Sequence, residues 1–141
     1  MALMRCDDTA VLQTLLAVAH GDVAKVLEAS AAKQWWVCVQ SERVLACLAL
    51  EIHEQCVFFD AIHILPHASM SPNSVLALVL EQLEAMALQH DCHTLQSLPQ
   101  WILSAPLAVY EKAAYQVVSR KVRVGEGGHH TQQVVLRKKL S

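Results

Sequence analysis

Hydrophobic and polar residues along the middle of the chain follow a pattern that predicts a strand, a loop, a helix and a second strand. Residues 56–65 form a largely apolar run, which is typical of a buried strand. Pro66 ends this run, and a short polar loop over residues 67–71 leads to Pro72, where a long amphipathic helix begins. A second strand is predicted over residues 94–98. The free backbone N–H groups at the start of such a helix favour the binding of a phosphate group.

The same reasoning predicts strands and helices over the rest of the chain. The expected strands are residues 2–6, 35–40, 43–53, 115–124 and 132–140, and the expected helices are residues 10–20, 22–32 and 104–114. Short turns make the strands between residues 35 and 65 an antiparallel meander. The long helix after Pro72 separates two strands that we expect to be parallel. This order predicts an α/β fold with a mixed sheet.

Composition indicates one domain over residues 1–141. Hydrophobic residues make up 54% of the chain and charged residues 17%, which suits a protein with a substantial core. No apolar run reaches the roughly 18 residues that cross a bilayer, and the N-terminus lacks the pattern of a secretory signal. We therefore expect a cytoplasmic protein with no membrane partner. The five cysteines include no C-x-x-C pair, which is typical of reduced, buried thiols.

Charge is divided unevenly along the chain, although the net charge is only −2. Residues 1–111 carry four basic and twelve acidic side chains, whereas residues 112–141 carry seven basic and one acidic side chain. The basic residues lie on predicted strands with little aromatic interleaving, so nucleic-acid binding is not indicated. An anionic small ligand or an acidic partner suits the basic segment better. Lys and Arg on solvated edge strands, where they resist aggregation, would explain it equally well.

Two short motifs carry a resemblance to a known family. Residues 108–115 read AVYEKAAY, and Ile62-x-Ile64-x-Pro66 ends the predicted strand at 56–65. The first resembles the segment A-x-x-L-Y-E-K-x-G-F, and the second the L-x-V-x-P, of the GNAT superfamily of acyl-CoA N-acyltransferases. The resemblance extends over essentially the whole chain. It implies a GNAT-like mixed, mostly antiparallel sheet of six to seven strands, flanked by about four helices.

The resemblance also implies acetyl-CoA, or another acyl-CoA, as co-substrate. In the family two parallel strands splay apart, and backbone groups freed there bind the pantetheine arm and the thioester oxygen. By resemblance these groups belong to Ile62, His63 and Ile64, and they would stand opposite residues 95–97. The whole hypothesis requires that the two strands diverge.

The family's phosphate-binding loop, Q/R-x-x-G-x-G/A, falls on residues 69–74, and this chain departs from it. Serine replaces the first residue, and Pro72 and a second serine replace the two glycines. Proline removes one N–H donor, and the loss of glycine hinders close approach of the backbone to a pyrophosphate. A well-capped helix start would also explain the segment. The residues that we expect to bind phosphate here are Ser69, Met70, Ser71, Asn73 and Ser74.

Catalytic roles follow from the same resemblance. Tyr110 would be the general acid that protonates the departing thiolate, because an ordinary pKa of about 10 keeps a tyrosine protonated. No clear general base is present. Asp60, Glu51 and His53 are candidates on or beside the strand pair, His63 is less suited because its neighbours are apolar, and a water relay would also serve.

No metal site is expected. The sequence contains eight histidines, but His63-x-x-x-His67 is interrupted by Pro66. The short groups around residues 90–93 and 129–130 lack the spacing of metal ligands. The glycine-rich stretch 125–131 joins two predicted strands and is typical of a hairpin.

Three hypotheses about function follow. The leading one is an N-acyltransferase that moves an acetyl group from acetyl-CoA to an unidentified amine by direct attack. The second is a catalytically degenerate GNAT-like domain that acts as a binding or dimerisation module, which leaves a homodimer open. Pro72 favours it, as do Leu103, where many members have Asn, and Phe58, near their acidic base. The third is an unrelated α/β domain that binds an acidic protein through basic strands.

Overall fold

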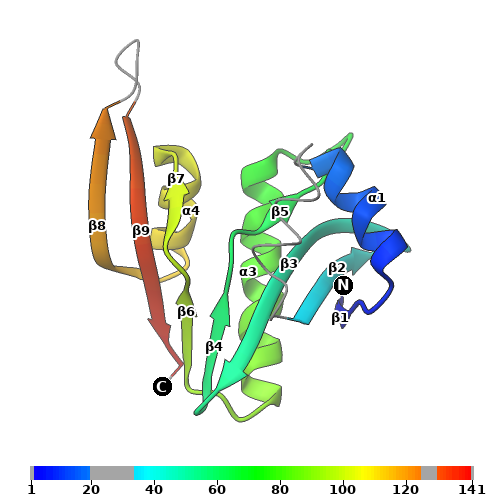
Figure 1. The fold of residues 1–141 in the computed structure, drawn as a ribbon, viewed down its shortest axis with the longest axis horizontal. Helices are drawn as coiled ribbons and strands as arrows, with labels where there is room; N and C mark the ends of the chain where they lie inside the picture. The colour runs from blue at the N-terminus through cyan, green and yellow to red at the C-terminus, as the bar shows by residue number, and fades with distance from the viewer. Residues whose placement is uncertain (1, 20–33, 125–129, 141) are drawn as a thin grey trace.

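The computed structural model describes residues 2–19, 34–124 and 130–140, in which short strands alternate with three helices (Figure 1). The elements are β1 (Ala2–Arg5), α1 (Thr9–Ala19), β2 (Gln34–Gln40), β3 (Arg43–His53), β4 (Cys56–Phe59), β5 (His63–Ile64), α3 (Pro72–Gln89), β6 (Thr94–Ser97), β7 (Gln100–Ile102), α4 (Ser104–Lys112), β8 (Gln116–Val124) and β9 (His130–Lys139). The helix predicted over residues 22–32 and most of the glycine-rich stretch, residues 125–129, lie outside the described residues.

Nine strands form one sheet in the described part of the chain. The strands β1, β2, β3, β4, β6 and β9 follow one another, β5 lies beside β3, and β7 and β8 lie beside β9. The β4–β6 pair is parallel, as predicted, and the other described pairs are antiparallel. The prediction of an α/β fold with a mixed, mostly antiparallel sheet is confirmed. The sheet has more strands than the six to seven that we expected.

One additional strand arises because a predicted strand is interrupted, and the other is a strand that was not predicted. Residues 56–65 were expected to form one strand, but β4 ends at Phe59 and β5 begins at His63. Between them, the Asp60 carboxylate accepts a hydrogen bond from the N–H of Ala61 at 2.8 Å, a local bond that competes with strand pairing. On the other side, Pro99 cannot donate to a ladder and separates β6 from β7. The short β7 was not predicted.

The helices cover opposite faces of the sheet (Figure 1). On one face, α3 and α4 bury a large core that includes Leu50, Phe59, Leu95 and Leu136 of the sheet. On the other face, α1 packs Leu12 and Leu16 against a smaller cluster, whose sheet residues are Trp35, Val37, Cys47 and Ala49. We call these the α3/α4 face and the α1 face.

Local sequence explains how α3 begins. Ser71 is its N-cap residue, and Pro72 occupies the first turn, where a missing N–H costs nothing. The Ser71 hydroxyl accepts a hydrogen bond from the N–H of Ser74 at 3.2 Å. The buried side chains recur at helical spacing and include Leu76, Val79, Leu80 and Leu83. The prediction of a long amphipathic helix that begins at Pro72 is therefore confirmed.

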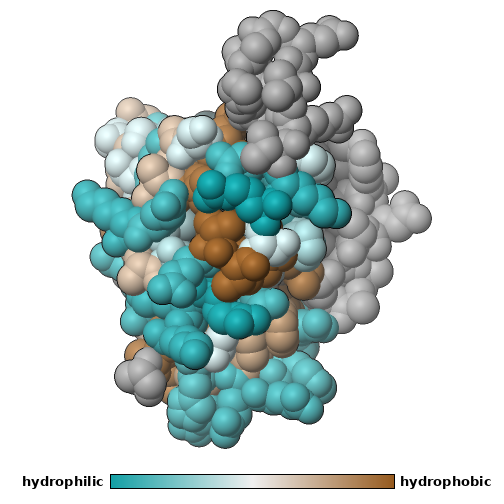
Figure 2. Space-filling view, turned by 90° about the vertical axis from the view of Figure 1, so that its left-hand side faces the viewer, coloured by the Kyte–Doolittle hydropathy of each residue, from teal (hydrophilic) through white to brown (hydrophobic). Residues whose placement is uncertain are grey.

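The strand β8 forms an edge of the sheet, because it pairs with β9 only. Figure 2, which looks onto this side of the molecule, shows an apolar strip bordered by hydrophilic side chains. Val118 lies at an irregularity of the β8–β9 ladder and is 46% exposed. Arg120 and Lys121 follow it and are exposed. Long cationic side chains on an edge strand hinder pairing with another chain.

Two leucines of α3 give a direct test of the packing. Leu83 is fully buried, whereas Leu88 is 51% exposed. We expect Leu83→Ala to lower the free energy of unfolding by about 3 kcal/mol, because it leaves a cavity in the core. Leu88→Ala, the same change in the same helix, should cost less than about 0.5 kcal/mol. Urea unfolding of both variants measures the difference, and equal losses would contradict the described orientation of the helix.

Candidate functional site

The parallel ladder at the centre of the sheet stops halfway. Cys56 to Phe59 of β4 pair with Thr94 to Ser97 of β6, and the last bond runs from the N–H of Leu98 to the carbonyl oxygen of Phe59 at 2.8 Å. Beyond this point β5 is paired with β3, β7 is paired with β9, and no pairing joins β5 to β7. The two halves of the sheet therefore diverge, as Figure 1 shows above β4 and β6.

The segment that stands across this gap is not the one we expected. Residues 95–97 were predicted to lie opposite Ile62, His63 and Ile64, but they are paired with β4. The strand beyond them, β7, takes that place instead. The prediction was wrong because it treated residues 56–65 as one strand and left out the interruption at residues 60–62. Without that interruption, residues 95–97 were placed opposite Ile62–Ile64 instead of opposite β4.

A cavity of about 290 Å³ lies between the diverging strands and the starts of α3 and α4. We call it the wedge cavity. Its lining includes Ile62, Ile64, Asn73, Gln100, Trp101 and Tyr110. Of the residues that the sequence singled out, the cavity thus brings together two of the three backbone candidates, one residue of the loop and the proposed acid.

Backbone groups of β5 point into the wedge. The N–H of Leu65 donates to the carbonyl oxygen of Leu45 at 2.9 Å, and the register pairs Ile64 with Ala46. Backbone groups of successive residues in a strand point to opposite edges. The N–H and carbonyl of Ile64 are therefore directed away from β3, towards the gap, where an extended ligand could pair with them.

Tyr110 lies under the wedge cavity, held by α4 and by two aromatic contacts. Its ring is stacked with Phe59, with centroids 6.4 Å apart, and meets Tyr115 edge-on at 5.4 Å. Burial raises the pKa of the Tyr110 hydroxyl well above its usual range, and the side chain of Gln100 offsets only part of this rise. The hydroxyl is therefore protonated at neutral pH and can act as a proton donor.

The loop before α3 satisfies several of its own donors. The Nδ1 atom of His67 accepts hydrogen bonds from the N–H groups of Ser69, at 3.0 Å, and Met70, at 3.1 Å. The Ser71 hydroxyl accepts from the N–H of Ser74 and lies 2.9 Å from the Ser74 hydroxyl. Two N–H groups that we expected to bind phosphate, those of Met70 and Ser74, are thus bonded within the loop, as is the N–H of Ser69. Sequence analysis missed this role of His67, for which no motif exists.

The three candidate bases lie in different surroundings. Asp60 sits where the strands begin to diverge, and its N–H donates to the carbonyl oxygen of Ala49 at 2.9 Å. Glu51 is exposed and lines another cavity, of about 500 Å³, beside Trp36. His53 is exposed and lies 3.7 Å from the carboxylate of Glu54. Asp60 is the candidate nearest to the point of divergence.

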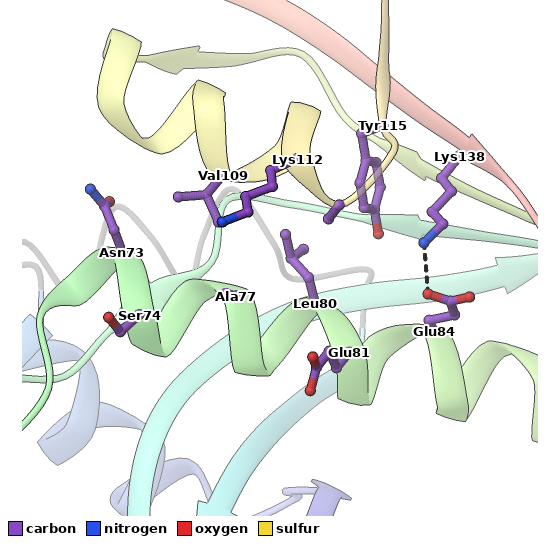
Figure 3. Close-up of a pocket in the computed structure, with 11 residues that line it drawn as sticks. Asn73, Ser74, Ala77, Leu80, Glu81, Glu84, Val109, Lys112, Tyr115 and Lys138 are labelled. Carbon is purple, nitrogen blue, oxygen red and sulfur yellow. Dashed lines mark hydrogen bonds and ion pairs between the residues drawn. The ribbon is translucent and has the colours of Figure 1, made fainter.

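A third cavity, of about 480 Å³, runs between α3 and α4. We call it the helix groove. Figure 3 shows Asn73 and Lys112 towards one end, and Tyr115 and Lys138 at the other. Lys138 forms an ion pair with Glu84 at 2.7 Å, and its Nζ lies 5.9 Å from the centre of the Tyr115 ring. Asn73, at the start of α3, lines both the helix groove and the wedge cavity.

The thiols are poor candidates for chemistry. Cys6, Cys38, Cys47, Cys56 and Cys92 form no disulfide. Burial raises the pKa of Cys47 to about 12 and also raises that of Cys38, Cys56 and Cys92, so their reactive thiolate form is disfavoured at neutral pH.

Among the described residues, no group of three or more His, Cys, Asp or Glu side chains could hold a metal ion. None of the described helices has the length and apolar character needed to span a membrane.

Neither a protein-family model nor a curated protein matches the sequence. The fold, in contrast, is similar to many solved structures. A GNAT family acetyltransferase from Elizabethkingia anophelis with acetyl-CoA bound has a TM-score of 0.72 at 12% identity, over 99% of this chain and 97% of that chain. The ribosomal-protein-S18-alanine N-acetyltransferase from Escherichia coli has a TM-score of 0.71 at 14% identity, over 99% and 94%.

An acetyltransferase from Bacillus subtilis in complex with CoA has a TM-score of 0.70 at 16% identity, over 99% of both chains. Since the likeness covers whole chains, the fold is GNAT-like, as the resemblance implied. Identities this low do not carry an activity from one chain to the other.

The two buried tyrosines predict a dependence of stability on alkaline pH. Burial raises the pKa of Tyr110 and of Tyr115 above the unfolded value of about 10. Below about pH 10 both tyrosines are protonated in the folded and in the unfolded chain, and the protein has its full stability. As the pH rises further, the unfolded chain releases these protons while the folded chain keeps them, so the free energy of unfolding falls. Above that pH each tyrosine should lower the free energy of unfolding by up to about 1.4 kcal/mol per pH unit.

Tyr110→Phe should remove one tyrosine's share of this alkaline slope of the free energy of unfolding, and Tyr115→Phe should remove the share of the other. Urea unfolding over a series of alkaline pH values measures the slope for the wild type and both variants. A Tyr110→Phe variant with the wild-type slope would mean that the hydroxyl ionises equally easily in the folded and unfolded chains.

Proposed function

We propose that this protein is an N-acyltransferase of the GNAT type, with residues 1–141 as one acyltransferase domain that moves an acetyl group from acetyl-CoA to an amine. The observation that carries the proposal is the divergence of β5 from β7, with a cavity between them and Tyr110 beneath it. The whole-chain likeness to acetyltransferases bound to CoA or acetyl-CoA supports it.

The wedge suits the pantetheine arm of acetyl-CoA. That arm is an extended chain with two amide groups, so it can pair with a strand edge much as another strand would. Along the free edge of β5, the carbonyl of Ile64 can accept a hydrogen bond from an amide of the arm, and its N–H is left for the thioester oxygen. The side chains of Ile62 and Ile64 supply apolar contact on the same wall. The backbone N–H and carbonyl of His63, between them, point to β3 instead, so we assign His63 no backbone contact with the cofactor.

The phosphates would lie at the start of α3, although fewer donors remain there than in the family's loop. His67 occupies the N–H groups of Ser69 and Met70. We assign the phosphate contacts to the N–H groups of Ser71 and Asn73 and to one hydroxyl, that of Ser71 or Ser74, since one of these two hydroxyls donates to the other. The positive end of the helix dipole lies behind them. Lys112, which lines the helix groove, adds a positive charge.

The chemistry requires three proton and charge movements, and the site offers a group for each. The attacking amine forms the new C–N bond and loses a proton, which we assign to Asp60 acting through water, with Glu51 as the more distant alternative. The N–H of Ile64 stabilises the oxyanion that develops on the thioester carbonyl. As the C–S bond breaks, Tyr110 donates its proton to the departing thiolate.

Binding of acetyl-CoA tests the proposal first. A ligand at 100 times its dissociation constant raises the free energy of unfolding by about 2.7 kcal/mol, so acetyl-CoA should raise the midpoint of thermal unfolding. Release of CoA thiol with a panel of amines then measures turnover. Absence of any stabilisation by acetyl-CoA would overturn the proposal.

Tyr110→Phe should lower kcat about a hundredfold or more, because the thiolate would leave without a proton. Its affinity for acetyl-CoA should remain close to that of the wild type. Tyr115→Phe is the matched control: this second buried tyrosine lies at the far end of the helix groove, and its hydroxyl has no hydrogen-bond partner among the described residues. Equal activity of both variants would exclude Tyr110 as the acid.

The phosphate assignment is tested by a pair of changes at Ser71. Asn and Asp cap a helix equally well, so Ser71→Asn and Ser71→Asp should both retain the stability of the protein. Only Asp places a negative charge where the phosphates would bind, and we expect it to raise the dissociation constant of acetyl-CoA at least about tenfold over Asn. Calorimetric titration measures both constants, and equal values would place the phosphates elsewhere.

The bonded loop also favours the second candidate function, a degenerate domain that binds a ligand or a second copy of the chain without turnover. Under that alternative, acetyl-CoA either does not bind or binds without thiol release in the presence of any amine. The same two measurements therefore separate the candidates.

A further inference from the structure

The acceptor amine would reach the wedge from the α1 face, where an exposed tryptophan lies beside it. In β7, Gln100 and Ile102 are buried, and Ile102 belongs to the core under α3 and α4. Because side chains alternate along a strand, Trp101 between them points to the α1 face. It is 51% exposed, and it lines the wedge cavity. The large aromatic ring of Trp101 therefore lies at the mouth of the wedge cavity, with about half of the side chain accessible to solvent.

The register of the sheet places a lysine in the same row as this tryptophan. Gln133 of β9 is paired with Trp101 on one side and with Lys121 of β8 on the other. Residues that oppose each other in a ladder project from the same face, so all three lie on the α1 face. With strands about 4.8 Å apart, Lys121 starts roughly 10 Å from Trp101. A small molecule with one polar group at each end can span this distance.

The opposite wall of the wedge is also aromatic. His63 lies in β5, and its ring is 6.0 Å from that of Trp35. Trp35 belongs to the cluster under α1, which places His63 on the α1 face. The mouth of the wedge on this face is therefore flanked by His63 and Trp101, and the row continues outward from Trp101 to Lys121.

We call the α1 face of the β6–β9–β8 half the outer wall, and its described side chains carry charge of one sign only. These side chains are Thr94, Gln96, Trp101, Gln116, Ser119, Lys121, Gln133, Val135, Arg137 and Lys139. None of these is acidic. Arg137 donates to the Gln96 carbonyl oxygen from Nε at 2.9 Å and from Nη2 at 2.7 Å. Lys121 is exposed and has no ion pair with a described residue.

Resting on the acyltransferase function proposed above, we propose that the acceptor is an amine with a flat apolar body and a negatively charged group at its other end. The amine enters the wedge between His63 and Trp101. The flat body lies on the Trp101 ring, and the anionic end reaches Lys121. A polyamine suits this wall poorly, because its second cation would meet Lys121 with no carboxylate among the wall's described side chains to compensate for the repulsion.

Three matched amines test the inference: para-(aminoethyl)benzoate, phenylethylamine and para-(aminomethyl)phenylethylamine. They share one ring with an aminoethyl group, and their para ends are negative, neutral and positive. Each is titrated calorimetrically into the CoA-saturated protein, so the readout does not require turnover. The dissociation constant should rise from the first amine to the last, by up to about fivefold at each step, as expected for an exposed charge pair.

Lys121→Glu should reverse this order. Arg120→Glu is the matched control, since it makes the same change of charge at the neighbouring exposed residue, which opposes Val134 and so points to the α3/α4 face. It should keep the wild-type order. Trp101→Ala should weaken the binding of all three amines by a similar factor, up to about tenfold. Tightest binding of the doubly cationic amine to the wild type, or equal effects of the two glutamate variants, would overturn the inference.

The same titrations distinguish this inference from the function on which it rests. If acetyl-CoA stabilises the protein but none of the three amines binds, or all bind equally, the acceptor assignment is wrong and the acyltransferase proposal stands. If acetyl-CoA itself does not stabilise the protein, the acyltransferase proposal fails, and the acceptor assignment fails with it.

Discussion

A parallel ladder that ends at Phe59 and Ser97 is the constraint on which the rest of this structure depends. Backbone N–H and carbonyl groups inside a protein need partners, and beyond this point β5 and β7 each keep a strand partner on one side only. The free edges face a cavity rather than each other. Both α3 and α4 also begin at that cavity, so their unpaired first-turn N–H groups are directed to the same region. A fold that leaves this many backbone donors and acceptors around one gap suits a ligand that is itself extended and polar along its length.

The sequence predicted well those features that depend on local chemistry. The strand β3 was predicted to the residue, and α3 was recognised from Pro72 and its cap at Ser71, because proline and serine have specific preferences at the start of a helix. The interruption of residues 56–65 was missed. Hydrophobicity continues through Ala61 and Ile62, whereas the break depends on a side-chain bond of Asp60 that periodicity does not reveal. Missing that break misplaced the strand opposite Ile64 and hid β7, whose three residues are too few for a periodic pattern.

The candidate site was predicted less completely than the fold, for a related reason. Tyr110 was found because it sits in a motif, but its neighbours Phe59 and Tyr115 come from other elements, and only the packed core brings the rings together. Trp101 and Lys121 are unremarkable in the sequence. They acquire a shared position only through Gln133, which lies between them in the sheet. Register is a tertiary property, so a functional row that crosses three strands is invisible to an analysis of one segment at a time.

The loop before α3 shows how stability and binding compete at one place. In the family's pattern glycine leaves the loop amides open to a phosphate, whereas here the ring of His67 takes two of them. An N–H group that is already bonded gains little from a new acceptor, since one hydrogen bond must break for the other to form. A phosphate would therefore bind to the remaining donors of Ser71 and Asn73, or it would displace the histidine. The second route frees the imidazole to turn outward, so His67 would act as a built-in competitor whose removal strengthens, rather than weakens, the affinity for an anionic ligand.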